Sequence, residues 1–305
     1  MTAAVVFPGQ GSQFVGMADA WTTHGASRMV LDVASDAMGR DLVAGCRDEA
    51  SLGTTEFVQP ALLALDVAAF AALESSGVAF AGAAGHSLGE FAALVAAGVI
   101  ELADALEIVL VRGRAMQEAG ERRPGTMTAL LGAGAGLAAE LCDQAREGDV
   151  LLVANENSPQ QVVISGTVAA IERAEALAFG RRVRAVRLKV AGAFHSPLME
   201  DAVPPLSAAI DAAEFRPPRF PIAANVTGEL AADAEELRAL LKRNVVSAVR
   251  WERCAKALEA AGAIVFVEAG PGDVLTRLAK RNVPGARAVA VGSPADVASV
   301  AAELA

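Results

Sequence analysis

Short apolar runs and longer apolar-rich stretches follow one another in the first part of the chain. The run Ala3–Phe7 ends at Pro8 and Gly9, which is typical of a buried strand that leads into a loop. Pro60–Leu73 is apolar at nearly every position and predicts a helix buried on several sides. Val78–Ala84 then predicts a second strand, followed by a sharp turn and a helix over Glu90–Ala97. A further helix is expected over residues 104–116.

The pattern changes between residues 126 and 190. Its segments have the order strand, helix, strand, strand, helix, strand, which is that of a ferredoxin-like unit. The four expected strands and two expected helices are 127–131, 137–146 (helix), 150–154, 161–165, 168–179 (helix) and 183–190.

One more buried strand is expected over residues 264–267, ahead of a glycine- and proline-rich loop. Alternating strands and helices on both sides of a ferredoxin-like unit predict an α/β fold. We expect a large α/β-hydrolase-like catalytic subdomain formed by residues 1–125 and 191–305. The ferredoxin-like small subdomain, residues 126–190, is expected to be inserted into it.

Composition bounds the class of protein. The 305 residues are 53% hydrophobic, enough for a sizeable core. Although the mean hydropathy is +0.39, Gly, Pro, Ser and charged residues interrupt the apolar stretches, so no membrane-spanning helix is expected. No positive charge precedes the first apolar run, and we therefore expect no secretory signal and a cytoplasmic protein. A monomer is the expected oligomeric state.

Charge and cysteine content exclude further classes. A net charge of −10 disfavours nucleic acid as the main partner. Cys46, Cys142 and Cys254 are far apart and form no CxxC pair or Cys/His cluster, so neither a disulfide framework nor a zinc site is expected. No metal or prosthetic group is expected at all.

The strongest local motif is Gly85-His86-Ser87-Leu88-Gly89, which matches G-x-S-x-G between a predicted strand and a predicted helix. A nucleophile at the apex of so tight a turn needs neighbours without side chains, which the two glycines provide. The turn also places Ser87 at a helix N-terminus, where free N–H groups stabilise developing negative charge. The alternative is an ordinary glycine-rich turn.

A serine nucleophile requires a general base, and the chain has only three histidines. His86 is adjacent to Ser87 and points the wrong way, and His24 lies in a polar stretch. His195 follows a strand, in a loop rich in Gly and Pro, and comes after the serine in chain order. Elimination makes His195 the candidate base, although a single loop histidine is more often structural.

Several further motifs occur in a fixed order along nearly the whole chain. In that order and together with the serine motif, they resemble those of the malonyl-CoA:acyl carrier protein transacylases and the acyltransferase domains of polyketide synthases. The motifs are Phe7-Pro8-Gly9-Gln10-Gly11-Ser12-Gln13, Gln59-Pro60-Ala61-Leu62, Arg112-Gly113-Arg114-Ala115-Met116-Gln117, Asn155-Glu156-Asn157-Ser158-Pro159, Phe194-His195-Ser196 and Gly270-Pro271-Gly272.

The resemblance implies a reaction through an acyl-enzyme. Ser87 would attack the malonyl thioester of coenzyme A, which enters only as substrate. His195 would move the protons, and the acyl group would pass to the phosphopantetheine thiol of an acyl carrier protein, in fatty acid biosynthesis. The backbone N–H groups of Gln10 and Leu88 would form the oxyanion hole.

The same resemblance assigns the substrate-binding residues. Arg112 would bind the free carboxylate of malonate, because its planar fork can make two parallel bonds to a carboxylate. Phe194 would fill the space of an α-methyl group and so favour malonyl over branched acyl groups; the alternative is a plain core residue. The remaining substrate-binding residues would be Gln59, Met116, Asn155 and Asn157.

One position departs from the family pattern. The stand-alone enzymes usually carry Gln where this chain has Asn244, and Asn is common in polyketide synthase domains. The shorter side-chain carbonyl of Asn244 is still expected to accept from the imidazole of His195 and to orient it.

Docking of an acidic carrier protein on an acidic chain requires a local basic patch. Arg277, Lys280 and Arg281 share one face of a predicted helix and are the expected carrier-binding residues, and Lys189 is a further candidate. The alternative is an ordinary charged helix face.

Three other functions share part of this pattern. They are a free-standing acyltransferase of a polyketide synthase, a serine thioesterase or hydrolase, and a non-catalytic scaffold. Arg112 and the Gln10 loop favour transfer over hydrolysis, and the joint presence of Ser87, His195, Gln10 and Arg112 disfavours a scaffold.

Overall fold

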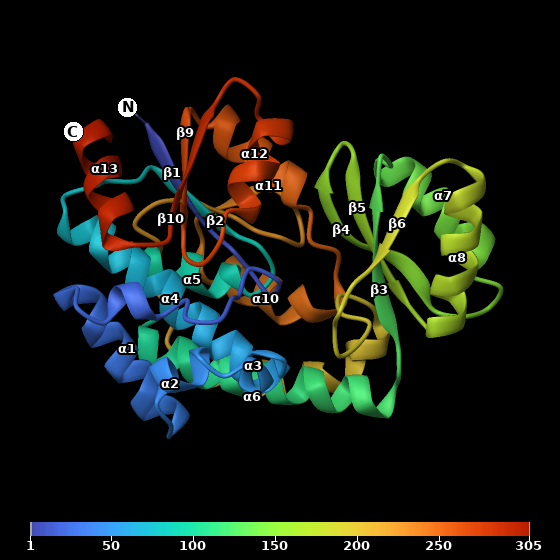
Figure 1. The fold of residues 1–305 in the computed structure, drawn as a ribbon, viewed down its shortest axis with the longest axis horizontal. Helices are drawn as coiled ribbons and strands as arrows, with labels where there is room; N and C mark the ends of the chain where they lie inside the picture. Colours follow the sequence, from blue (N-terminus) through green and yellow to red (C-terminus); the bar gives the residue numbers. More distant parts are fainter. Residues whose placement is uncertain (1, 305) are drawn as a thin grey trace.

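A six-stranded sheet forms the centre of the larger part of the molecule (Figure 1). The computed structural model describes residues 2–304. The strands have the order β10-β9-β1-β2-β7-β8, and all are parallel to their neighbours except β8, which is antiparallel to β7. Their bounds are β1 (Ala3–Phe7), β2 (Gly82–Gly85), β7 (Ile222–Ala223), β8 (Leu230–Ala231), β9 (Val265–Ala269) and β10 (Arg287–Val291).

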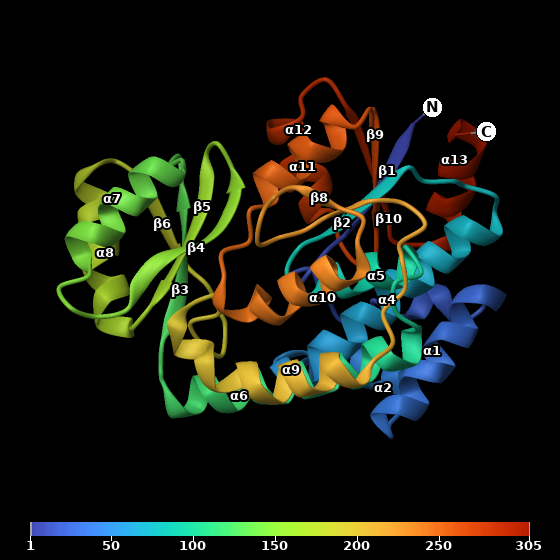
Figure 2. The ribbon, with the colours of Figure 1, turned by 180° about the vertical axis from the view of Figure 1, so that it is seen from behind.

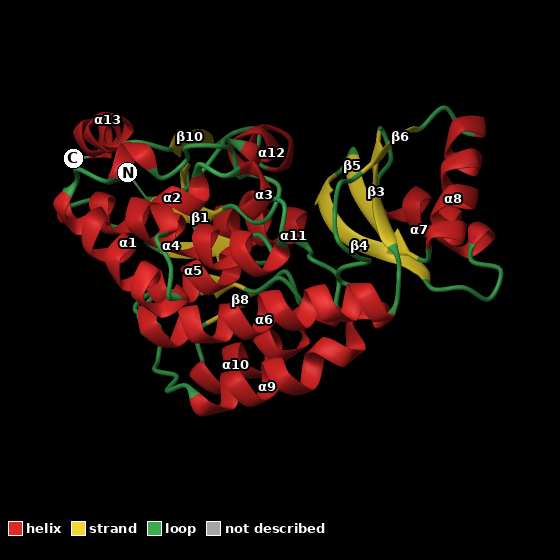
Figure 3. Ribbon diagram, turned by 60° about the horizontal axis from the view of Figure 1, so that its bottom comes forward, coloured by secondary structure: helices red, strands yellow, loops and turns green. Residues whose placement is uncertain are grey.

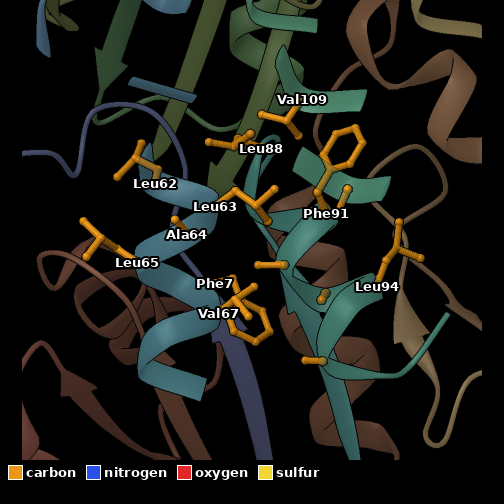
Figure 4. Packing of buried hydrophobic residues seen from close by; sticks show 14 of the residues in the cluster. Phe7, Leu62, Leu63, Ala64, Leu65, Val67, Leu88, Phe91, Leu94 and Val109 are labelled. Carbon is orange, nitrogen blue, oxygen red and sulfur yellow. The ribbon is translucent and has the colours of Figure 1, made fainter. Parts of the chain in front are cut away.

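Helices cover both faces of this sheet. Its central strand β1 is apolar at every position, so both of its faces must be buried. Alternate side chains of a strand point to opposite faces. Val5 and Phe7 accordingly join the apolar cluster of α4 (Thr55–Ser75) and α5 (Gly89–Ala96), as Figure 4 shows for Phe7. Ala4 and Val6 join a second cluster with α11 (Trp251–Ala260) and α12 (Val274–Asn282). The site described below lies where β1 and β2 end.

The remaining helices pack around this core (Figure 3). Of these helices the sequence pattern predicts only α6, over residues 104–116, and α6 is longer than predicted. The bounds of the remaining helices are η1 (Asp19–Trp21), α1 (Gly25–Met38), α2 (Leu42–Cys46), α3 (Glu49–Leu52), α6 (Leu102–Arg122), η2 (Pro197–Ala202), α9 (Val203–Ala212), α10 (Ala234–Arg243), η3 (Asn244–Val246) and α13 (Pro294–Leu304).

Helix α4 is the buried helix that the apolar stretch predicts, but it begins five residues earlier, at Thr55. Pro60 lies inside it and leaves the carbonyl of Glu56 without its usual helical donor. Burial of nearly every side chain outweighs that loss. By length and composition α4 could cross a membrane, yet 89% of its apolar window is buried inside the protein, as in the core helix of a soluble domain.

The smaller part contains an antiparallel sheet of four strands in the order β4-β5-β3-β6 (Figure 2). With its two helices this is the spatial order of a ferredoxin-like unit, and the two sheets together confirm the predicted α/β class. The elements are β3 (Thr126–Leu131), α7 (Ala135–Ala145), β4 (Leu151–Ser158), β5 (Gln161–Gly166), α8 (Val168–Gly180) and β6 (Arg184–Arg187). The subdomain boundaries after residues 125 and 190 stay a prediction.

Strand β6 is shorter than the expected 183–190. It pairs with β3 only as far as Arg187, and the backbone N–H of Leu188 still donates to Met127 at 2.9 Å. Lys189 and Val190 then leave the sheet. The residues that leave it line the cavities described next, which an alternating strand pattern does not indicate.

Candidate active site

The turn between β2 and α5 carries Ser87 in a left-handed backbone conformation, with φ of 52°. The turn requires glycine on both sides. A Cβ atom on Gly85 would lie 1.9 Å from the carbonyl of Gly89, and a Cβ on Gly89 would lie 2.2 Å from the carbonyl oxygen of Phe7. Strain of this kind in a non-glycine residue persists only where the surroundings enforce it. The predicted strand, sharp turn and helix are therefore present.

His195 faces the hydroxyl of Ser87, with 2.8 Å between Nε2 and Oγ. Its Nδ1 lies 2.9 Å from the carbonyl oxygen of Asn244 and 3.1 Å from that of Ser247. Because both groups accept, Nδ1 must carry the proton, and the Nε2 lone pair faces Ser87. Burial, and then the charge of Arg112, lower the pKa of His195 to about 3, so the imidazole is neutral at neutral pH.

Asn244 lies beside His195, but the prediction for its side chain is wrong. The backbone carbonyl, not the side-chain carbonyl, accepts from the imidazole. The side-chain Oδ1 instead accepts from Arg112 Nη2 at 3.2 Å, and Nδ2 donates to Glu90 at 2.6 Å. A backbone oxygen at the start of η3 already occupies the position near Nδ1, which frees the side chain for a second contact.

The guanidinium of Arg112 is almost completely buried, at 1% exposure, beside the nucleophile. It donates to Gln59 Oε1 at 2.7 Å and to Ser87 Oγ at 3.1 Å, besides Asn244. No carboxylate lies within ion-pair distance of it among residues 2–304, and its Nε has no partner there. Burial lowers its pKa to about 10, which leaves it charged. A buried cation with only neutral partners can bind an anion.

A cavity of about 90 Å³ adjoins these groups. Gln59, Met116 and Phe194 line it together with Ser87 and Arg112, and their contact with an acyl group stays a prediction. Gln59 Nε2 lies 3.6 Å from the sulfur of Met116. The small volume and the ring of Phe194 leave room for a short acyl group.

Gln10 and Leu88 also line this cavity. Within the described part of the chain, neither of their backbone N–H groups donates to a protein acceptor. Both therefore remain available to an oxyanion formed beside Ser87, the role predicted for them. Gln10 is fixed in turn by a contact of 3.4 Å between its Oε1 and Gln59 Nε2.

A larger cavity of about 510 Å³ continues from the small one and shares Gln10, His86 and Asn155 with it. Asn157 lines it too, and its Oδ1 accepts from His86 Nε2 at 2.8 Å. Nε2 of His86 is therefore bound to Asn157, whereas the hydroxyl of Ser87 faces His195. A cleft of this volume suits an elongated ligand, and the loop after β1, the antiparallel sheet and α12 all contribute to its wall.

The three basic residues proposed for carrier binding are exposed on α12. Val274 and Leu278 of the same helix line the larger cavity, so the patch lies beside that cavity. Arg277 is partly neutralised, because its Nε donates to Asp273 at 2.8 Å. Docking of the carrier at this patch stays a prediction.

Two residues near Ser87 were not assigned a role from the sequence. Asn225, after β7, accepts from the backbone N–H of Ser87 at 2.7 Å. Glu90, in the first turn of α5, accepts hydrogen bonds from Asn225 and Asn244. Glu90 directly follows the serine motif, which is a local signal for it, whereas nothing local marks Asn225.

Comparison with known proteins agrees with this geometry. The acyl transferase domain family matches residues 4–300. The malonyl CoA-acyl carrier protein transacylase of Escherichia coli K12 is 40% identical over 304 residues, which cover 97% of each chain. The chain belongs to the malonyl-CoA:acyl carrier protein transacylase family.

Other transacylases are similar to this chain in sequence and structure. The Bacillus subtilis transacylase is 36% identical and covers 95% of this chain, which covers 93% of it. The crystal structure of the Xanthomonas oryzae transacylase superposes with a TM-score of 0.95 at 39% identity, over 99% of both chains. A malonyl-transacylase solved in complex with a type II polyketide synthase carrier protein has a TM-score of 0.95 at 36% identity, over 99% of this chain and 100% of its own. These matches confirm the predicted family and fold.

Replacement of Gly85 by alanine should abolish the site. The added Cβ meets the backbone of Gly89 at 1.9 Å, so the turn must open and Ser87 must leave His195. We expect Gly85→Ala to lose at least about 10²-fold in Ser87 reactivity, because a displacement of about 1 Å costs that much. The rate of labelling by a fluorophosphonate measures this reactivity.

Gly136→Ala is the matched control, because Gly136 lies on α7 with no atom within 4 Å of the added Cβ. It should label like the wild type and gain stability by up to about 1 kcal/mol. A Gly85→Ala protein that labels at the wild-type rate would contradict the close packing of the turn.

Proposed function

We propose that this protein transfers a malonyl group from coenzyme A to the phosphopantetheine thiol of an acyl carrier protein, through an ester on Ser87. In this proposal the reaction serves fatty acid biosynthesis. The relatives are named as malonyl CoA-acyl carrier protein transacylases, which is the same transfer. Three buried, free cysteines are consistent with the reducing cytoplasm. A monomer suffices, because residues of one chain line both cavities.

The observation that carries this proposal is the contact between Arg112 and Ser87, with 3.1 Å between Nη2 and Oγ. An anion on the guanidinium must lie close to the carbonyl that Ser87 attacks. Malonyl thioesters have a carboxylate one methylene away from that carbonyl. An acetyl group lacks the carboxylate and would leave the buried cation unpaired, which is costly.

Acylation follows from the positions of two side chains. His195 Nε2 takes the proton of Ser87 as Oγ attacks the thioester carbonyl. The N–H groups of Gln10 and Leu88 donate to the oxyanion. Collapse breaks the C–S bond, and the coenzyme A thiolate leaves with the proton from His195.

The second half-reaction reverses these steps with a different thiol. His195 takes the proton of the phosphopantetheine thiol, and the thiolate attacks the Ser87 ester. Ser87 leaves and recovers the proton from Nε2. The pantetheine arms of coenzyme A and of the carrier protein can reach Ser87 by the same route, through the larger cavity beside Gln10 and His86.

The substrate carboxylate also raises the basicity of His195. In the free protein burial lowers the pKa of this histidine most, and the charge of Arg112 lowers it further. A carboxylate on Arg112 neutralises that charge, so the imidazolium form costs less once malonate is bound. Neutral acyl groups lack this effect, which favours reaction of malonyl groups over neutral acyl groups.

A polyketide synthase carrier protein is the second candidate acceptor. A structural relative with 36% identity is a malonyl-transacylase in complex with such a carrier. The exposed Arg277, Lys280 and Arg281 beside the larger cavity suit an acidic carrier of either kind.

Malonyl-CoA should acylate Ser87, whereas acetyl-CoA and methylmalonyl-CoA should do so far less. Intact and peptide masses measured before and after the addition of carrier protein test this. We expect one malonyl group on the Ser87 peptide, which then appears on the carrier. Ser87→Ala, the control, should carry none. An ester that only water removes would support a hydrolase instead, and the absence of any adduct or turnover would contradict the enzyme assignment.

Charge reversal on α12 should weaken docking of the carrier. Arg277→Glu combined with Lys280→Glu is expected to lower kcat/KM for the carrier about tenfold at low salt, because charged rims act mainly on association. The loss should shrink as salt screens the charges. Steady-state transfer at two ionic strengths measures it.

Arg28→Glu combined with Arg47→Glu provides the matched control, because both residues are exposed elsewhere, on and near α1 and α2. This variant should transfer like the wild type. If the α12 variant also loses acylation of Ser87 by malonyl-CoA to the same extent, the patch is not a carrier-docking surface.

A further inference from the structure

Glu90 is a buried carboxylate in the first turn of α5, three residues after Ser87, at 3% exposure. Its Oε1 accepts from the backbone N–H of Asn225 at 2.9 Å, and its Oε2 accepts from Asn244 Nδ2 at 2.6 Å. No Lys, Arg or His lies within ion-pair distance of it in the described residues. A buried charge without an ion partner lowers the stability of the folded protein, so a functional role for this carboxylate is worth considering.

One branch of this network reaches the nucleophile. Asn225 accepts from the Ser87 N–H at 2.7 Å through Oδ1, and its Nδ2 donates to the carbonyl of Gly85 at 2.7 Å. A single side chain thus links Gly85, at the end of β2, to the strained Ser87. Glu90 fixes the backbone of Asn225 and thereby the position of that link.

The other branch reaches the anion site. A carboxylate only accepts hydrogen bonds, so the amide nitrogen of Asn244 must face Glu90. Its Oδ1 must then face Arg112, where it accepts from Nη2 at 3.2 Å. The backbone oxygen of the same Asn244 holds His195. The ionised carboxylate of Glu90 therefore determines that the oxygen of the Asn244 side chain, and not its nitrogen, faces Arg112.

We propose that Glu90 is a positioning residue that, through Asn225 and Asn244, holds the Ser87 turn and the Arg112 guanidinium in register. The proposal builds on the malonyl transfer described above but concerns residues that contact neither substrate nor the reacting atoms. Gln in place of Glu would have the same shape. Its amide would present a donor to one of the two asparagines, which breaks one branch.

The pH dependence gives a readout that a purely structural role would not give. Burial raises the pKa of Glu90 to about 7, against the hydrogen bonds from Asn225 and Asn244 and the charge of Arg112 from α6. The thiol of Cys254 from α11 also lies near it. Below that pH the carboxyl is protonated and can no longer accept from both asparagines. Activity should therefore fall as pH decreases through about 7. His195, with its lower pKa, does not account for a fall there.

The test compares Glu90→Gln and Glu90→Asp with Glu107→Gln, an exposed glutamate on α6. We expect Glu90→Gln to lose about 10²-fold in kcat/KM for malonyl-CoA, as for a small misplacement of reacting groups. The preference of this variant for malonyl-CoA over acetyl-CoA should fall, and its activity should no longer decrease as the pH falls through about 7. Glu90→Asp keeps the carboxylate and should retain that decrease. Melting temperatures show whether each variant is folded.

The labelling rate of Ser87 with a fluorophosphonate tests the nucleophile branch without any malonyl substrate. Glu90→Gln should label more slowly, whereas Glu107→Gln should match the wild type. Folded Glu90 variants with wild-type labelling, kinetics, acyl preference and pH profile would overturn the proposal. Lack of malonyl transfer by the wild type would instead overturn the proposed function, and the labelling comparison would still decide the role of Glu90.

Discussion

The site is organised around one buried cation. Arg112 is almost fully removed from water and has hydrogen bonds only to neutral groups, Gln59, Ser87 and Asn244. Desolvation of a charge costs several kcal/mol, and neutral acceptors recover only part of it. In the proposed reaction a substrate carboxylate supplies the missing partner. Burial lowers the pKa of His195 most, and the charge of Arg112 lowers it further until that carboxylate binds. In this proposal, selection of the acyl group and part of the activation of the base depend on one interaction.

The fold makes this arrangement possible by bringing distant segments to the ends of two parallel strands. β1 delivers the Gln10 loop, and β2 delivers Ser87, while α6 carries Arg112 past both. The antiparallel sheet closes the other side with Asn155 and the segment after β6. Figure 1 shows the two parts side by side, with the smaller sheet to the right of the larger one. Tight glycine packing beneath Ser87 keeps the nucleophile in a strained conformation that its surroundings enforce.

The sequence predicts those parts of the fold and site that leave a local or family pattern. Ser87 follows from glycines at fixed spacing, and His195 follows because so few histidines compete with it. Residue identity could not reveal that Asn244 contacts His195 through its backbone, since any residue at that position has a carbonyl. Asn225 was missed because its neighbours in the chain carry no motif and only the parallel pairing of β2 with β7 brings it to Ser87. Short β7 and the edge strand β10 likewise lack an apolar pattern long enough to stand out.

The most direct test measures kcat/KM for malonyl-CoA and acetyl-CoA in the wild type and in Arg112→Met. Methionine keeps an unbranched chain in the cavity but removes the charge. The account predicts that the preference for malonyl-CoA falls by about 10²-fold or more, while acetyl transfer is maintained or improved. A folded variant that keeps the wild-type preference, or that loses both activities equally, would contradict the claim that this cation selects the substrate.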